Sequence, residues 1–449
     1  MRFFKIHLRW AMLVSLFFAA ACRQEQTVNP RFATADFSSE TANEWFQLTM
    51  NLVRTTPGYT PPVAAHTYGL MGIALYESVV AGMPTHQSLD GQLLGLSGMP
   101  KADPNKDYYF PECANAALSM MAERLFPTAS ADYKQLMALL KTNFETKYSK
   151  ATSVEVFQRS KEFGESLALA LYSLSATDPI SHEAYNKNFP LSYTPPVGAD
   201  SLWEPTPPAF RKAMQPYWGS ARTFTPNILP EATATAPPPF SKTPNSYFYN
   251  LGLEVRDKVN NSTSEEKDIA KFWSDDPAKT ATPSGHWISI ARQILTTQNS
   301  SLNTAAETYA KVGIAVSDAF ICCWKTKYET NLLRPVTYIK RYIDPNWLPL
   351  LDTPPFPEYT SGHSTQSTAA AQMLSNMFGN SFQFTDNTHQ SRTDINGTPR
   401  TYSSFEAAAK EAAESRLLGG IHYRTGNEAG ETQGKKLADK ILSTLKFRK

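Results

Sequence analysis

Long stretches of this chain repeat apolar residues at intervals of three and four, with one proline-rich interruption. Apolar residues spaced in this way line one face of an α-helix, whereas alternating apolar and polar residues would indicate strands. We therefore expect an all-α fold of helical bundles. The expected helices cover residues 39–54, 64–82, 112–125, 129–148, 152–174, 246–260, 264–274, 285–298, 302–334, 363–378, 403–418 and 428–446.

The interruption covers residues 178–245 and contains Pro195-Pro196, Pro207-Pro208 and Pro237-Pro238-Pro239. Proline at this density breaks helices, because it lacks a backbone N–H and its ring collides with the preceding turn. We expect a long ordered loop region that wraps the helical body, a feature that usually has a task such as covering a pocket. A shorter polar stretch, residues 380–401, is typical of a surface turn or hairpin.

The charge balance excludes several classes of partner. The 449 residues include 43 basic and 41 acidic side chains, which gives a net charge of +2, and 41% of residues are hydrophobic. This apolar content supplies a sizeable core. A nearly neutral chain has no global field that would favour nucleic acid or an anionic membrane surface. Any anion binding must therefore be local.

The N-terminus has the features of an export signal. Basic residues up to Arg9 precede an apolar run from Trp10 to Phe18, which is shorter than the roughly 20 residues that a membrane span requires. Small residues then lead directly into Cys22, as at a bacterial lipoprotein cleavage site. We predict a signal over 1–21, lipidation of Cys22, a tether over 22–37, and one large helical domain over 38–449. The protein would be exported and face the periplasm or cell exterior, attached to the membrane only through its lipid; ordinary cleavage with an incidental Cys22 is the alternative.

Three cysteines remain after that signal, namely Cys113 and the adjacent pair Cys322 and Cys323. Neighbouring cysteines rarely bridge each other because the geometry is strained, so a disulfide scaffold is not expected. Buried free thiols are the interpretation that we adopt.

The first of three chemically informative segments contains Lys327 and Arg334, followed by Pro335. On one helix, a separation of seven residues is nearly two turns, so both cations would leave the same face about 10 Å apart. They could then converge on one anion. The proline disfavours helical geometry at Arg334 and marks a helix end there.

The second segment is Ser361-Gly362-His363, which precedes an expected helix. A helix start presents free backbone N–H groups and the positive end of the helix dipole to an anion. Gly362 permits close approach, and His363 could exchange a proton near neutral pH.

The third segment contains Arg416 and His422, with Gly419-Gly420 between them. On a regular helix these side chains would point about 240° apart, so a break at the glycines is needed to direct both to a common site. The planar fork of arginine suits a tetrahedral oxyanion.

Together and in this order, the three segments resemble the signature of the vanadium-dependent haloperoxidases and the type-2 phosphatidic acid phosphatase superfamily: Lys-x6-Arg-Pro, then Ser-Gly-His, then Ser-Arg-x4/5-Gly-x-His. The resemblance covers residues 327–422. It implies the helical haloperoxidase fold, with vanadate as the cofactor and hydrogen peroxide, a halide and small organic acceptors as reactants.

The resemblance also implies roles for individual residues. Lys327, Arg334 and Arg416 would neutralise the oxyanion, and Ser361 and Gly362 would donate hydrogen bonds to it. His422 would be the axial ligand to the metal, and His363 the acid or base. Trp324 and Phe356 match positions where chloroperoxidases of this family place two aromatic residues beside the halide.

Two features depart from the pattern or duplicate it. Members of the family often carry aspartate four residues after the axial histidine, where this chain has Gly426; Glu428 is a possible substitute. A second Ser-Gly-His occurs at 284–286, but its surroundings lack the other two segments. We therefore expect it to begin another helix, with His286 or the pair Asp275 and Asp276 near the pocket. His66 is expected to be a core histidine.

Two other functions remain open from the sequence. One is a secreted acid phosphatase in which His422 attacks phosphorus and His363 protonates the leaving group. The other is a noncatalytic surface lipoprotein with a degenerate pocket.

Overall fold

The computed structural model describes residues 32–449. The predicted signal, Cys22 and most of the predicted tether lie outside the described residues. Helices form nearly all the regular structure, which confirms the all-α expectation: α1 (Glu40–Thr55), α2 (Pro61–Val79), α3 (Phe110–Leu125), α4 (Ala131–Tyr148), α5 (Val154–Ser175), α6 (Ile228–Glu231), α7 (Tyr247–Asn260), α8 (Ser264–Phe272), α9 (Thr282–Thr297), α10 (Leu302–Thr330), α11 (Pro335–Tyr342), α12 (Gly362–Phe378), α13 (Phe405–Leu418) and α14 (Arg424–Thr444).

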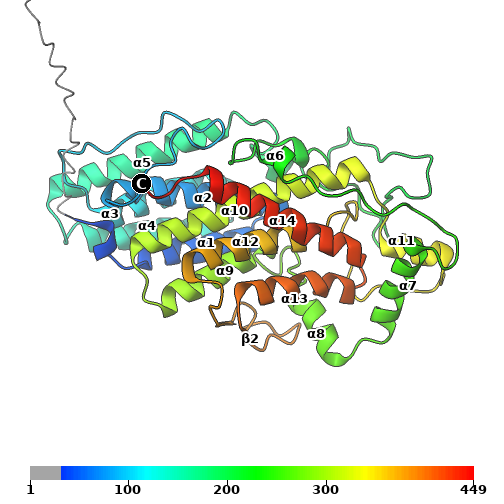
Figure 1. The fold of residues 1–449 in the computed structure, drawn as a ribbon. Helices are drawn as coiled ribbons and strands as arrows, with labels where there is room; N and C mark the ends of the chain where they lie inside the picture. The colour runs from blue at the N-terminus through cyan, green and yellow to red at the C-terminus, as the bar shows by residue number, and fades with distance from the viewer. Residues whose placement is uncertain (1–31) are drawn as a thin grey trace, which may run out of the picture.

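The centre of the molecule is the long helix α10, which packs against α2 and α12. Glycines allow the close approach of α10 and α2, since a Cβ at Gly313 would lie 2.6 Å from the carbonyl oxygen of Tyr68. Helix α12 also packs on α13 and α14. In Figure 1, α10, α12 and α14 run through the middle of an elongated body, with α3 to α5 at one end and α7 and α11 at the other.

Local sequence signals explain many of the helix starts. Serine side chains accept a hydrogen bond at the first turn of α4, α5 and α7, and Thr263 with Glu266 forms a capping box on α8. Proline occupies the first turn of α2, α3, α9 and α11, where its missing N–H costs nothing.

One expected helix, over 302–334, was too long. Helix α10 ends at Thr330 because Asn331 adopts a left-handed conformation with φ of 46°. The chain then restarts as α11, which the periodicity did not predict. Helices α9 and α14 also begin three and four residues earlier than expected, at Thr282 and Arg424.

The proline-rich region 178–245 is an ordered covering of the helical body, as predicted. It contains short helical turns at Ala184–Asn186 and Trp218–Ser220 besides α6. Asp318 on α10 anchors it by accepting hydrogen bonds from the backbone nitrogens of Phe224 and Thr225, at 2.7 and 2.9 Å.

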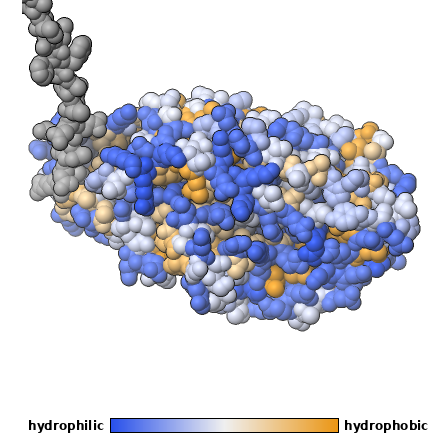
Figure 2. Space-filling model, in the orientation of Figure 1, coloured by the Kyte–Doolittle hydropathy of each residue, from blue (hydrophilic) through white to orange (hydrophobic). Residues whose placement is uncertain are grey.

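The expected hairpin is also present, because β1 (Phe384–Asp386) pairs antiparallel with β2 (Arg400–Tyr402). Cys113, Cys322 and Cys323 are free and buried, which confirms that prediction. Within residues 32–449, none of the helices combines the length and apolar character needed to cross a bilayer. Figure 2 shows one face on which polar side chains predominate and apolar residues form small separate patches.

Candidate active site

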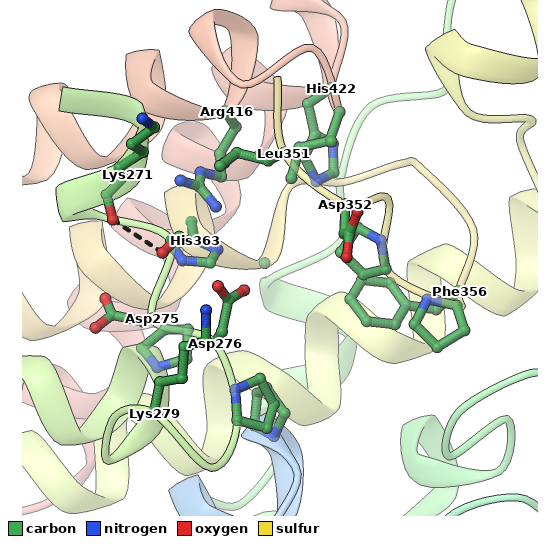
Figure 3. A pocket seen from close by; sticks show the side chains of 18 of the residues that line it. Lys271, Asp275, Asp276, Lys279, Leu351, Asp352, Phe356, His363, Arg416 and His422 are labelled. Carbon is green, nitrogen blue, oxygen red and sulfur yellow. Dashed lines mark hydrogen bonds between the residues drawn. The ribbon is translucent and has the colours of Figure 1, made fainter. Parts of the chain in front are cut away.

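A cavity of about 540 Å³ gathers residues from the second and third informative segments. Gly362, His363, Arg416 and His422 line it. Figure 3 shows the side chains of His363, Arg416 and His422 around the same space, which Asp276 approaches from another side. Residues separated by up to 60 positions in the sequence are therefore brought to one place, as the motif order predicted.

Lys327 and Arg334 lie directly behind this cavity, but not on one helix as expected. Lys327 is in the last turn of α10, and Arg334 is the N-cap of α11, after the chain has turned. Both side chains are fully buried. They nevertheless converge, because both donate to backbone carbonyls of residues 356–358: Lys327 Nζ to Pro357 and Glu358 at 3.0 and 2.9 Å, and Arg334 Nε to Phe356 at 2.8 Å.

The Ser-Gly-His segment opens α12, as predicted. Ser361 is the N-cap, and its hydroxyl oxygen accepts a hydrogen bond from the backbone nitrogen of Ser364 at 3.3 Å. His363, in the first turn, has a buried Nε2 without a hydrogen-bond partner among the described residues. This geometry leaves a neutral imidazole and the start of a helix at the edge of the cavity.

Arg416 and His422 reach the same cavity because α13 ends between them. The helix stops at Leu418, and Gly420 takes a φ of 76°, a left-handed conformation that suits glycine. Arg416 donates through Nη2 to the carbonyl oxygen of Ala270 at 3.1 Å and through Nε to Ser415 Oγ at 3.0 Å. The predicted role of the glycine break is confirmed.

A carboxylate that the sequence analysis missed fixes the ring of His422. Glu358 Oε1 lies 2.7 Å from His422 Nδ1, and the glutamate is fully buried. On the other side of the ring, Arg334 Nη1 lies 3.1 Å from Nε2. Because Nδ1–H donates to the carboxylate, the lone pair of the ring lies on Nε2, where it accepts a hydrogen bond from Arg334 and could bind a metal instead.

The chain is similar to proteins of known family. Residues 307–448 match the family model described as the VCPO second helical-bundle domain. The vanadium chloroperoxidase of Curvularia inaequalis is 34% identical over 128 residues, which cover 23% of this chain and 21% of that protein. The chain thus spans only about a fifth of the length of this curated relative, whereas the family model covers all three segments.

A bacterial vanadium-dependent iodoperoxidase structure aligns over 92% of this chain and 97% of its own, with 32% identity and a TM-score of 0.81. The chain belongs to the vanadium-dependent haloperoxidase family. Holo and apo structures of a bacterial vanadium-dependent chloroperoxidase, both 16% identical, have TM-scores of 0.63 and 0.66 and support the fold alone.

In this family member, Glu358 occupies the space that a side chain at position 426 would fill, which accounts for the glycine there. A Cβ at position 426 would lie 2.2 Å from Glu358 Oε1, closer than atoms can approach, so a side chain there would displace the glutamate. Glu428, the suggested substitute for the missing aspartate, is exposed, so that suggestion was wrong. The carboxylate instead comes from the segment before Ser361, 64 residues earlier in the chain than His422. Two features of the sequence could have identified Glu358 as the partner of His422: aspartate is missing at position 426, and an acidic residue stands at position 358.

Burial lowers the pKa values of the basic side chains in the candidate site. It lowers the pKa of Lys327 to about 7, and the pKa values of Arg334 and Arg416 to about 10. It lowers the pKa of His363 and of His422 well below the usual range. The two arginines therefore remain charged at neutral pH while both imidazoles are neutral. An oxyanion in the cavity would compensate these desolvated cations.

Trp324 and Phe356 form an aromatic wall of the same cavity, with ring centroids 4.7 Å apart. Phe320, which the sequence analysis did not select, packs on Trp324 at 5.2 Å and also lines the cavity. The predicted pair therefore belongs to a larger apolar surface beside His363 and His422.

The second Ser-Gly-His is not an oxyanion loop. It lies in the first turns of α9, as expected, and both ring nitrogens of His286 contact carboxylates. Asp275 and Asp276 do line the cavity. His66 is buried, contacts Ser317 Oγ through Nδ1 at 3.2 Å and stacks on Phe224, as expected of a core histidine.

Proposed function

We propose that this protein is a vanadate-dependent haloperoxidase that oxidises a halide with hydrogen peroxide to hypohalous acid, which then halogenates small organic acceptors. The observation that carries the proposal is the meeting of His363, Arg416 and His422 at one cavity, with Lys327 and Arg334 buried directly behind it. Three cationic side chains are thus brought within reach of one cavity, which Asp275 and Asp276 also line.

The residues present fit vanadate. Arg334 Nη2 is a buried donor that has no partner among the described residues, and His363 Nε2 is a buried ring nitrogen that also has none there. An uncompensated buried donor such as Arg334 Nη2 is costly, so an oxyanion that accepts from it would stabilise the site. When bound, vanadate supplies a Lewis-acidic centre that activates peroxide toward attack by halide.

The chain's own residues would divide the remaining work. Lys327, Arg334 and Arg416 neutralise the oxyanion, and the Ser361 hydroxyl with the Gly362 N–H donates to it. His422 Nε2 would be the nitrogen that binds the vanadium. His363 would accept a proton from the incoming peroxide, since burial lowers its pKa and leaves the ring neutral, with Nε2 unpaired among the described residues. The aromatic wall of Trp324, Phe356 and Phe320 excludes water from the position of a weakly hydrated halide.

Halide oxidation is expected to depend on added vanadate. After dialysis against a chelator, the protein should oxidise iodide, bromide or chloride only when orthovanadate is restored, and phosphate should compete with it. Each halide and a phosphate ester would be assayed with and without vanadate. Halide oxidation by the vanadate-free protein contradicts the proposal. Phosphate-ester hydrolysis that vanadate inhibits would instead support the phosphatase, and the absence of any oxyanion binding in calorimetry would support a noncatalytic protein.

We further propose export and anchoring through Cys22, on the basis of the basic and apolar residues that precede it. A labelled fatty acid should be incorporated into the full-length chain expressed in bacteria, and Cys22→Ser should abolish incorporation and release the protein from the membrane fraction. Equal labelling of the two chains would contradict lipidation at this position.

A further inference from the structure

The last turn of α8 and the residues that follow it contact two groups of the proposed vanadate site through their backbone. Arg416 donates to the carbonyl oxygen of Ala270 at 3.1 Å. The backbone of Trp273 hydrogen bonds with the ring of His363. The orientation of a cation and of the proposed acid or base therefore depends on where the main chain of residues 270–275 lies.

The residues between Phe272 and Thr282 are not in a helix. Helix α8 ends at Phe272, and Asp275, Ala278 and Thr282 all have positive φ values, of 48°, 68° and 68°. Residues with a Cβ adopt this conformation at an energetic cost, which the surrounding contacts must offset. The contacts of Asp275 therefore show what stabilises this conformation.

Asp275 is held by His286, which lies between two carboxylates. His286 Nδ1 is 2.8 Å from Asp275 Oδ2, and Nε2 is 2.7 Å from Asp386 Oδ2. His286, Asp275 and Asp386 are at most 2% exposed. Burial alone would lower the pKa of His286, but the two carboxylates outweigh it and raise the pKa to about 10. The ring is therefore an imidazolium that donates a hydrogen bond in each direction.

Trp273 is fixed by the same histidine. Its indole stacks on the His286 ring at a centroid distance of 4.3 Å and an interplanar angle of 19°, and its Nε1 donates to Glu411 Oε1 at 3.0 Å. A cation over an indole face is a favourable arrangement. His286 thus restrains the two residues on either side of Ser274, one through its ring face and one through Nδ1.

A metal ion is the alternative reading of this cluster. Asp275, His286 and His389 each offer a ligand atom, and these atoms lie within 4.8 Å of one another. However, both nitrogens of His286 are already at hydrogen-bond distance from carboxylate oxygens. An ion would have to displace the proton on Nδ1 and move Asp275, so the geometry favours the imidazolium.

We propose that His286 is a positioning residue, whose ring, fixed between Asp275 and Asp386, holds residues 270–275 where their backbone orients Arg416 and His363. This assigns a task to the second Ser-Gly-His, which the family signature left without one. The inference rests on the proposed function, since it concerns the same site.

The test is His286→Gln, which removes the charge and one of the two hydrogen bonds. We expect kcat for halide oxidation to fall about tenfold, since small displacements of catalytic groups have effects of this order or larger. Vanadate affinity, measured by calorimetry, should also weaken, and the pH profile of kcat should shift because the surroundings of His363 change.

His86→Gln is the matched control. His86 is also buried, and it contacts Glu307 at 3.0 Å, but it lines a different cavity. Its loss should lower the melting temperature while kcat, the pH profile and vanadate affinity stay at wild-type values. Asp386→Asn, which keeps the contact between His286 and Asp275, should give a smaller change in the same direction as His286→Gln and serves if that variant does not fold.

The proposal is overturned if His286→Gln and Asp386→Asn match His86→Gln in kcat, pH profile and vanadate affinity. It is also overturned if the purified protein contains one equivalent of a divalent metal that His286→Gln loses. Wild-type protein without vanadate-dependent halide oxidation would contradict the proposed function instead. In that case orthovanadate or phosphate binding by the variants still tests the orientation of Arg416.

The stability of the cluster should depend on pH in a defined window. The pKa of His286 is raised from 6.5 to about 10, so its contribution is complete below about pH 6.5 and is lost as the pH rises through about 10. The pKa values of Asp275 and Asp386 are lowered, so their contribution is present above about pH 4 and is lost in more acidic solution. His389, 3.3 Å from Asp275, faces the same carboxylate. Denaturant unfolding should therefore show the largest difference between wild type and His286→Gln near pH 5 to 6, and a shrinking difference toward pH 10.

Discussion

Glu358→Gln is expected to weaken vanadate binding by about 10- to 100-fold, the usual effect of losing a group that orients a metal ligand. The carboxylate accepts from His422 Nδ1 at 2.7 Å and also from the backbone nitrogen of Tyr423 at 3.2 Å. An amide at this position can donate to Nδ1, which would move the ring proton to Nε2 and block the nitrogen that binds the metal. Isothermal titration with orthovanadate measures the effect directly.

The structure also provides a rescue experiment. Gly426→Asp alone should be damaging, because its Cβ would lie 2.2 Å from Glu358 Oε1. Glu358→Ala alone should weaken vanadate binding, because His422 Nδ1 loses its hydrogen-bond partner. Together, the two changes place a carboxylate where other family members have it, so the double variant should bind vanadate more tightly than either single variant. This non-additivity is the signature of two residues that serve one contact.

Glu428→Gln is the control for the loss of a carboxylate, since Glu428 is exposed and near Gly426 in the chain. It should bind vanadate as the wild type does. The interpretation of Glu358 fails if Glu358→Gln behaves like this control, or if the double variant is no better than its parents.

His422→Ala is expected to abolish halide oxidation, with a loss of at least about a hundredfold in kcat. The proposed axial nitrogen disappears, whereas Lys327, Arg334 and Arg416 remain. The variant should therefore still bind phosphate or vanadate measurably, but weakly, so that activity falls further than affinity. Steady-state kinetics at saturating vanadate, together with calorimetry, separates these two quantities.

Added imidazole provides a check on this variant. The cavity of about 540 Å³ that His422 lines is large enough to admit a free imidazole in place of the missing ring. Partial recovery of activity with imidazole would indicate that the axial nitrogen was lost rather than the fold. His182→Ala, which alters a partly exposed histidine outside this cavity, should retain full activity. Wild-type activity in His422→Ala would exclude the assigned role.

Local signals in the sequence were sufficient for most of the fold. Apolar spacing located the long helices, and proline density located the covering region. The error at 302–334 has a specific cause: Asn331 adopts a left-handed conformation that its neighbours in sequence do not dictate. Pro335 indicated a boundary near Arg334, but it was interpreted as the end of one helix rather than the start of another.

The site was predictable where its chemistry lies in short motifs. Ser361, Gly362 and His363 function together because they open one helix, and Gly420 explains how Arg416 and His422 meet. By contrast, Glu358 and His422, or His286 and Asp386, are 64 and 100 residues apart. Such pairs depend on how helices pack, and periodicity carries no information about which side chain meets which across an interface.

The burial of all three described cysteines has a consequence for an enzyme whose product would be a strong oxidant. Cys113, Cys322 and Cys323 are at most 3% exposed, and burial raises the pKa values of Cys113 and Cys322 well above the usual range. The thiolate, rather than the thiol, is the form that hypohalous acid attacks most readily. The thiols of Cys113 and Cys322 are thus kept protonated, and all three sulfur atoms are kept away from solvent, so the proposed enzyme would release a corrosive product repeatedly without consuming its own thiols.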